Sequence, residues 1–206
     1  MLHLFISLII LAVFQGIAEF LPISSSGHLV ILGEIPFVRN SLALTGEDMN
    51  MLINVSLHVA TLIAIILYLR RDIWRILSGF FIQAFKRNFS GIEFRTGMFV
   101  LTASVPAGII GLLFHEYFEK LFNSPILVYI FLIINGIILI TANKIPSKGR
   151  KIEEAGFVRS LVIGFCQAFA MIPGISRAGM TIAGGIANGL EPVEAARFSF
   201  LMAIPV

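Results

Sequence analysis

Three long runs of apolar residues constrain the fold of this chain more than any other feature. They cover residues 51–69, 97–114 and 127–143, and none of them contains Asp, Glu, Lys or Arg. Each run approaches the roughly 20 residues that an α-helix needs to cross the hydrocarbon core of a bilayer. Only 13% of the 206 residues are charged, whereas a soluble domain has about 25%. The sequence therefore predicts an all-α, polytopic membrane protein.

The positive charges predict its orientation. Lys and Arg gather in two loops, residues 70–95 and 144–159, and two predicted spans separate these loops. Because cytoplasmic loops carry an excess of Lys and Arg, we expect both loops on the cytoplasmic side. Within the first loop, residues 74–89 alternate apolar and basic side chains, which is typical of a helix lying at the interface. The net charge of +3 is too small to indicate a nucleic-acid partner.

Two short polar stretches interrupt the apolar sequence. Residues 15–28 contain a carboxylate, a proline, three consecutive serines, a glycine and a histidine, and residues 172–181 contain a proline, hydroxyls, glycines and an arginine. Lipid tolerates such polarity only where the segment lines a protein-walled or watery cavity. We interpret the two stretches as the halves of one site.

The two stretches also match each other at a constant spacing of 152 residues. The matched pairs are Gln15 and Gln167, Ala18 and Ala170, Ile23 and Ile175, Ser24 and Ser176, Gly27 and Gly179, and Gly33 and Gly185. The matches favour an internal duplication. Three spans separate the copies, so re-entrant copies would enter from opposite faces and form inverted-topology repeats, whose broken helices meet near the midplane. Copies that each cross fully would be parallel instead.

This hypothesis divides the chain into two repeats. Residues 1–143 hold the first, with a re-entrant helix pair at about 2–37 followed by three spans. Residues 144–206 begin the second, with a re-entrant pair at about 160–190 and a helix from about 193 that stops partway across. If the second repeat mirrors the first, about two further C-terminal spans are missing and the chain is truncated.

The motifs of the two stretches resemble one known family. Gln15-x-x-x-Glu19 with Pro22-x-Ser24-Ser25-Ser26-Gly27-His28, together with Pro173-Gly174-x-Ser176-Arg177, is similar to the undecaprenyl-diphosphate phosphatase family of the integral-membrane, bacitracin-resistance type. The resemblance implies hydrolysis of undecaprenyl diphosphate to undecaprenyl phosphate and phosphate. It further implies dependence on a divalent cation, a place in the bacterial plasma (inner) membrane, and recycling of the lipid carrier of cell-wall synthesis.

The residues suit that chemistry. Arg177 can donate two hydrogen bonds to phosphate oxygens, and Glu19 can hold Mg²⁺ or Ca²⁺ with Gln15 as a neutral oxygen ligand. Members of the family that the chain resembles often have Glu at the Gln15 position. Gln here removes one negative charge and weakens the case for a metal site with two carboxylates. The sequence leaves the nucleophile open between His28 and a serine such as Ser25. The candidate catalytic residues are Glu19, Ser25, His28 and Arg177. The candidate phosphate-binding residues are Ser24, Ser26, Gly174, Ser176, Arg177 and Thr181.

Other interpretations compete with this one. Ser24, Ser25, Ser26 and Ser176 would also suit helix N-caps, and Glu19 with Arg177 could form a purely structural ion pair. His58 is better explained as a cavity or packing residue than as a ligand. A transporter or flippase of an anionic lipid would show the same broken helices, and a non-catalytic lipid-binding subunit is a weaker third class. Monomer and homodimer both remain open.

Overall fold

The structure is a computed structural model that describes residues 2–122 and 124–205, without the side chains of Glu47, Asp48 and Glu119. In that part the chain is helical and forms no β-strand, only an isolated bridge between Arg150 and Leu190. The predicted all-α class is confirmed. The elements are α1 (Leu2–Ala18), α2 (Ser25–Gly33), α3 (Pro36–Leu42), α4 (Glu47–Tyr68), α5 (Arg70–Phe85), α6 (Ile92–Phe122), α7 (Pro125–Ala142), a 3₁₀ turn (Ile152–Glu154), α8 (Gly156–Phe169), α9 (Arg177–Ala187) and α10 (Pro192–Met202).

Three of these helices are long and apolar enough to cross a membrane. The segments are Met49–Tyr68 in α4, Ile92–Phe118 in α6 and Pro125–Ala142 in α7, which confirms the three predicted spans. Large apolar side chains cover their outer faces; Leu112 of α6, for example, is 81% exposed. Such surfaces are unfavourable in water and suit contact with lipid.

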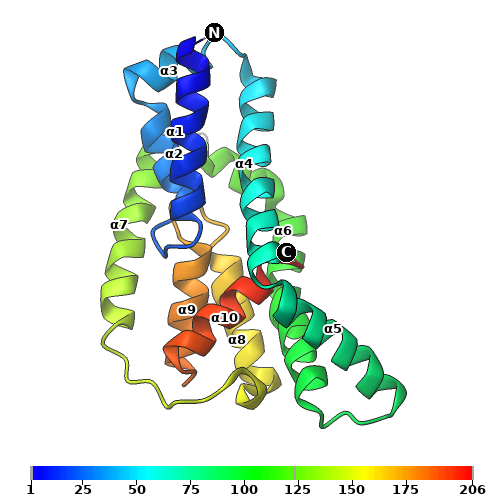
Figure 1. Cartoon of the computed structure of the whole chain (residues 1–206). Helices are drawn as coiled ribbons and strands as arrows, with labels where there is room; N and C mark the ends of the chain where they lie inside the picture. The colour runs from blue at the N-terminus through cyan, green and yellow to red at the C-terminus, as the bar shows by residue number, and fades with distance from the viewer. Residues whose placement is uncertain (1, 123, 206) are drawn as a thin grey trace.

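Two further helix pairs meet in the middle of the molecule. Figure 1 shows that α1 and α2 reach the centre from the end where the N-terminus lies, and that α8 and α9 reach it from the opposite end. The chain breaks between the two helices of each pair, at residues 19–24 and 170–176. This geometry is the one expected for re-entrant pairs that enter from opposite sides. The duplication itself stays a prediction.

A serine ends each break and begins the second helix of its pair. Ser24 Oγ accepts a hydrogen bond from the Gly27 N–H at 3.3 Å, and Ser176 Oγ accepts one from the Gly179 N–H at 3.0 Å. These are N-caps, which satisfy one of the free N–H groups of a first helical turn. The structure thus confirms the capping interpretation for Ser24 and Ser176. These two serines match each other in the sequence comparison, as do the glycines that they cap, Gly27 and Gly179.

Two boundaries differ from those expected. The apolar run of residues 97–114 predicts a span that ends at Phe114. Instead α6 runs on to Phe122, and its irregular residue is Phe114, with φ −121° and ψ 17°. The re-entrant pair predicted at about 2–37 ends earlier, because α2 stops at Gly33 and Pro36 starts the new helix α3. Proline has no N–H and suits the first turn of a helix, so it separates α3 from α2.

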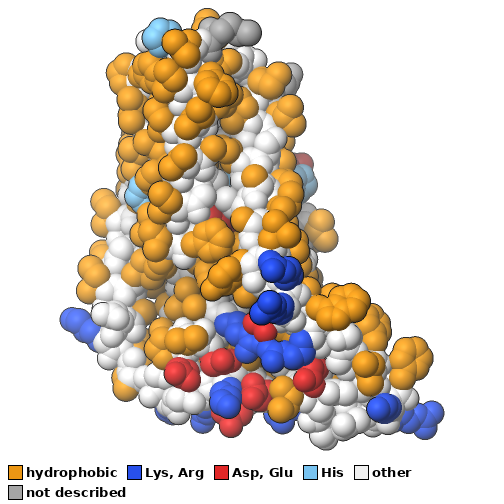
Figure 2. All heavy atoms as spheres, in the orientation of Figure 1, with side chains coloured by type: hydrophobic (Ala, Val, Ile, Leu, Met, Phe, Trp, Pro, Cys, Tyr) orange, Lys and Arg blue, Asp and Glu red, His pale blue; other side chains and the backbone are white. Residues whose placement is uncertain are grey.

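Charged side chains gather at one end of the molecule. In Figure 2 the Lys, Arg, Asp and Glu side chains lie mainly at the lower end, around α5 and the α7–α8 loop, while the upper surface is largely hydrophobic. Both basic loops therefore lie on the same side, as the orientation expected from the sequence requires. There Arg197 of α10 donates to Asp72 of α5, with Nε 2.9 Å from Oδ2.

The largest buried cluster lies below the centre, among α6, α8 and α10. Phe99, Ile163, Phe198 and Met202 are each at most 2% exposed. The α6 and α8 backbones approach closely, because a Cβ on Gly164 would lie 2.3 Å from the Ala103 carbonyl oxygen. Small residues allow such approaches between membrane helices. This packing holds α8, the first helix of the second broken pair, in place.

Candidate functional site

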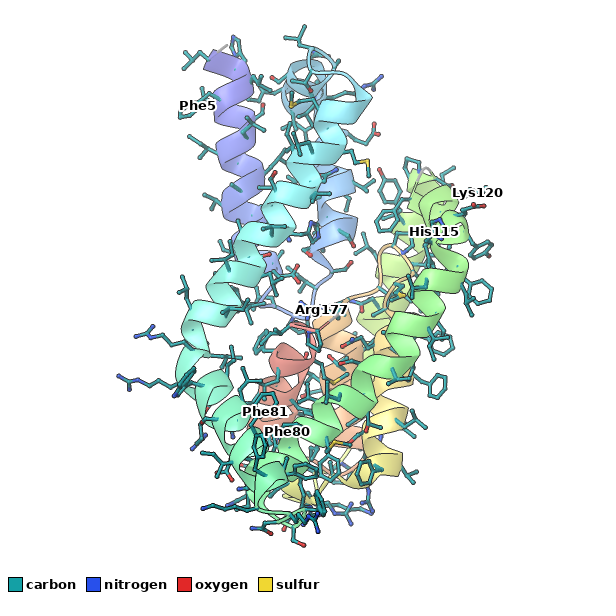
Figure 3. All side chains as sticks on the ribbon, turned by 90° about the vertical axis from the view of Figure 1, so that its right-hand side faces the viewer. Phe5, Phe80, Phe81, His115, Lys120 and Arg177 are labelled. Atoms are coloured by element: carbon teal, nitrogen blue, oxygen red, sulfur yellow. The ribbon has the colours of Figure 1, made fainter. Side chains whose placement is uncertain are left out.

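The two breaks are joined by an ion pair. Glu19 follows directly on α1, and Arg177 is the first residue of α9. Arg177 Nη2 lies 2.5 Å from Glu19 Oε1, and the two side chains are 24% and 13% exposed. Figure 3 places Arg177 at the centre, where the upper helix pair ends and the orange α9 begins. Each motif therefore supplies one charge to a single site, as the sequence predicted for its two halves.

Two more side chains bind the same carboxylate. Ser25 Oγ donates to Glu19 Oε2 at 2.7 Å, and Gln15 Nε2 donates to that oxygen at 3.0 Å. Gln15 and Glu19 are four residues apart at the end of α1, so their side chains lie on one face. Ser25 begins α2 on the other side of the break. Two site residues predicted from the first motif, Gln15 and Ser25, thus converge on Glu19.

Asn135 of α7 holds the two breaks together. Its Oδ1 accepts from the Ser176 N–H at 3.0 Å, and its Nδ2 donates to the Pro22 carbonyl at 3.4 Å. The residue is 3% exposed. A buried amide in a membrane span is expected to make such hydrogen bonds. The sequence interpretation missed this residue, although an Asn in the middle of the apolar run 127–143 was a visible signal.

The breaks also touch each other reciprocally. A Cβ on Gly27 would lie 3.0 Å from the Gly174 Cα, and a Cβ on Gly179 would lie 3.2 Å from the Pro22 carbonyl oxygen. Gly27 matches Gly179 in the sequence comparison, and Pro22 occupies the position of Gly174. A two-fold axis between two equivalent segments produces such crossed pairs. The contacts favour the predicted inverted repeat and require small residues at the interface.

A cavity of about 210 Å³ opens beside the ion pair. Its polar lining consists of Glu19, Ser25, Ser26, His58, Ser176 and Arg177. The Arg177 guanidinium still has a donor group available, because Nη1 is buried without a hydrogen-bond acceptor among the described residues. A donor in that situation suits an anionic oxygen, which would satisfy it with a charge-assisted bond.

Several candidate residues do not line this cavity. Thr181 is 1% exposed, and its hydroxyl lies 2.6 Å from the Ser199 hydroxyl of α10. Ser24 is occupied as a cap. Gly174 has φ +93° and packs on α7, where a Cβ would lie 2.5 Å from the Val128 carbonyl oxygen. These three residues shape the breaks, and a direct role in phosphate binding stays a prediction for each.

The structure brings His58, and not the motif residue His28, to the cavity. The His28 ring stacks on Phe14, with centroids 5.6 Å apart, and its Nδ1 lies 2.9 Å from the Ser24 carbonyl oxygen. The structure does not bring this ring to the cavity. His58 of α4 does line the cavity, in agreement with the interpretation of His58 as a cavity or packing residue.

The donor set fits one hard cation better than a metal cluster. Among the described residues, no group of three or more His, Cys, Asp or Glu side chains gathers. Gln15 Oε1, however, is buried beside Glu19 without a hydrogen-bond donor in the described part of the chain. A carboxylate accepts about four hydrogen bonds or ligands, and Glu19 accepts three. One carboxylate with a free amide oxygen suits Mg²⁺, which proteins often hold through one or two carboxylates and substrate phosphates.

The fold and the cavity define an integral membrane protein with a polar cavity between two broken helix pairs. The family described as bacitracin resistance protein BacA matches residues 8–206. This chain belongs to that family, which confirms the resemblance found in the motifs.

Three relatives illustrate the similarity. The undecaprenyl-diphosphatase of Rubrobacter xylanophilus is 40% identical over 200 residues, which cover 96% of this chain and 71% of the relative. Undecaprenyl-diphosphatase 1 of Pseudoalteromonas translucida is 38% identical, covering 98% of this chain and 72% of the relative. The undecaprenyl-diphosphatase of Methanosphaera stadtmanae is 37% identical, covering 97% and 73%.

Proposed function

We infer that this chain hydrolyses undecaprenyl diphosphate to undecaprenyl phosphate and phosphate. The observation that carries the inference is the contact of Ser25, Arg177 and Glu19 in one cavity, in a chain whose relatives are named for this activity. A phosphoryl transfer needs a positioned nucleophile and positive charge at the transferred group. Ser25 supplies the first and Arg177 the second.

Ser25 is the proposed nucleophile. Its hydroxyl already donates to Glu19 Oε2, so the carboxylate can accept the proton as Oγ attacks the terminal phosphorus. A nucleophile within hydrogen-bond reach of its base, with the base held by a third group, is the arrangement common to covalent catalysis. Here Arg177 and Gln15 hold the base. The bond to the bridging oxygen breaks, lipid monophosphate leaves, and water then hydrolyses the phosphoserine.

Arg177 and the serine hydroxyls bind the phosphate. Arg177, Ser26 and Ser176 line the same cavity, and Arg177 Nη1 has no acceptor among the described residues. A bound phosphate would compete with Glu19 for the guanidinium and so release the carboxylate to act as a base. A divalent cation, held by Glu19 and Gln15, would neutralise further phosphate charge when bound.

The proposal also covers the location of the protein and the lipid tail of its substrate. The three spans support an integral membrane protein, and we place it in the bacterial plasma membrane with a polyprenyl diphosphate as its substrate. Its apolar surface would lie beside the lipid tail while the diphosphate reaches the cavity. Recycling of the lipid carrier for cell-wall synthesis follows from the reaction products.

The test compares hydrolysis with transport, the rival class. Purified protein in detergent receives undecaprenyl diphosphate, and phosphate release is measured with Mg²⁺, with Ca²⁺ and with a chelator. Release that depends on the protein supports the proposal. No release under any metal condition, together with movement of the intact lipid diphosphate between the leaflets of vesicles, would favour the flippase.

A further inference from the structure

His58 is the cavity residue whose presence the motifs do not explain. Among the described lining residues it is the one imidazole, and it comes from α4, a helix whose neighbouring side chains Val55 and Val59 are about half exposed. A polar ring on such a helix is unfavourable against lipid and therefore faces protein or a watery cavity. His58 is exposed, and it is part of the lining of the cavity beside Glu19 and Arg177.

The ring orientation leaves one nitrogen for chemistry. His58 Nδ1 lies 2.9 Å from the Asn54 carbonyl oxygen. A carbonyl only accepts hydrogen bonds, so Nδ1 carries a proton in either charge state of the ring. Nε2 is then a lone-pair acceptor in the neutral ring and an N–H donor in the cation.

Hydrolysis through a phosphoserine moves protons at two places in each half of the reaction. Glu19 takes the proton of Ser25 in the first half and can return it to Ser25 Oγ in the second. Arg177, which also lines the cavity, has only N–H donors and no acceptor. A second acid and base, most often His in enzymes, would serve the bridging oxygen and the attacking water, and α5, which follows α4, contributes no side chain to the lining.

We propose that His58 is a catalytic acid and base of this hydrolysis; the proposal rests on the proposed function. As the Ser25 Oγ–phosphorus bond forms, the bond from that phosphorus to the bridging oxygen breaks. Its electron pair stays on the bridging oxygen, which takes a proton from Nε2 of cationic His58, and the lipid monophosphate leaves. Neutral Nε2 then takes a proton from the water that attacks the phosphoserine, while Ser25 Oγ leaves and recovers its proton from Glu19. One water is consumed, and both side chains return to their starting states.

The test is the pH profile of a His58→Gln variant, with His115→Gln as the matched control. His115 also lies on an apolar helix, with its Nδ1 3.3 Å from the Leu112 carbonyl oxygen, and Figure 3 places it on the upper part of α6, away from Arg177. General acid–base catalysis typically contributes about 10²–10⁴-fold. His58→Gln should therefore lower kcat at least about 100-fold, leave KM nearly unchanged, and remove one limb of the pH profile of kcat. His115→Gln should match the unsubstituted protein.

A substitution that merely disturbs packing is separated by rescue. His58→Ala leaves room beside the cavity, and added imidazole should restore turnover with saturation while His28→Ala gains nothing. Turnover of His58→Gln within threefold of the unsubstituted protein, with both limbs of the pH profile retained, would overturn the proposal. So would a His58→Ala protein that no concentration of imidazole improves. If the unsubstituted protein releases no phosphate, the proposed function fails first and the role of His58 falls with it.

Discussion

Arg177 and Glu19 lie 158 residues apart in the chain and form an ion pair with Nη2 2.5 Å from Oε1. The pair joins the tips of two helix pairs that approach from opposite ends of the molecule. A buried ion pair contributes little net stability, yet removal of one partner leaves an uncompensated charge. Because Arg177 Nη1 stays without an acceptor among the described residues, the pair is suited to receive a further anion as well as to hold the tips.

Ser25→Ala tests the nucleophile. The substitution removes the hydroxyl that donates to Glu19 and lies in the cavity, so turnover should fall by at least about 10³-fold, as is usual when a nucleophile is lost. The measurement is phosphate release, together with a search for phosphoserine after rapid acid quench. Ser56→Ala is the control, because Ser56 is exposed on α4. Turnover of Ser25→Ala near that of the control would contradict Ser25 as the nucleophile and favour His28 instead.

Gly174→Ala tests the shape of the second break. Gly174 has φ +93°, a conformation that an L side chain rarely adopts, and a Cβ would lie 2.5 Å from the Val128 carbonyl oxygen. Both effects should push the break away from α7 and lower turnover and Tm together. Gly136→Ala, in α7 itself, is the matched control because its Cβ would meet nothing within 4 Å. Equal Tm values for the two variants would contradict the described packing.

Asn135→Ala tests the bridge between the breaks. The change leaves the Ser176 N–H and the Pro22 carbonyl without their partner. An unsatisfied buried group costs about 1–3 kcal/mol, so Tm in detergent should fall by several degrees. Turnover should fall as well, since both tips lose their common support. Asn143→Ala, just beyond α7 on the exposed surface, should change neither quantity, and a Tm of Asn135→Ala equal to it would contradict the bridge.

Metal removal tests the donor set of Gln15 and Glu19. A chelator should abolish phosphate release, and added Mg²⁺ or Ca²⁺ should restore it. Gln15→Glu replaces a neutral ligand by a second carboxylate, which should lower the metal concentration needed for half-maximal activity because ligand charge raises affinity for hard cations. An unchanged metal requirement in Gln15→Glu would remove Gln15 from the site. Full activity in the chelator would remove the cation from the proposal.

The spans and the breaks could be predicted because each depends on local sequence. Apolar length determines whether a helix can cross lipid, and the polar residues 15–28 and 172–181 stand out within such sequence. The partners of Glu19 could be predicted in part, since Gln15 lies one helical turn away and Arg177 belongs to the matching motif. The family motifs supplied the remaining site residues.

Other features depend on tertiary contacts that no local pattern encodes. The irregular residue of α6 is Phe114 rather than Pro106, although proline is the usual local signal for a kink. Thr181 carries a hydroxyl in the motif, but that hydroxyl lies 2.6 Å from the Ser199 hydroxyl of α10, a contact that no spacing in the sequence predicts. His28 and His58 are both bonded through Nδ1 to a carbonyl four residues earlier. Only the arrangement of α4 and α2 decides which of the two rings reaches the cavity.

The most direct measurement is phosphate release from undecaprenyl diphosphate by the unsubstituted protein, Glu19→Ala and Arg177→Ala, prepared in the same detergent. The ion pair is proposed as both the base and the phosphate clamp, so each substitution should abolish release while the protein remains folded, as judged by its helical circular dichroism. Release by the unsubstituted protein alone is the predicted result. Near-normal turnover in either variant would contradict the assignment of the site to Glu19 and Arg177.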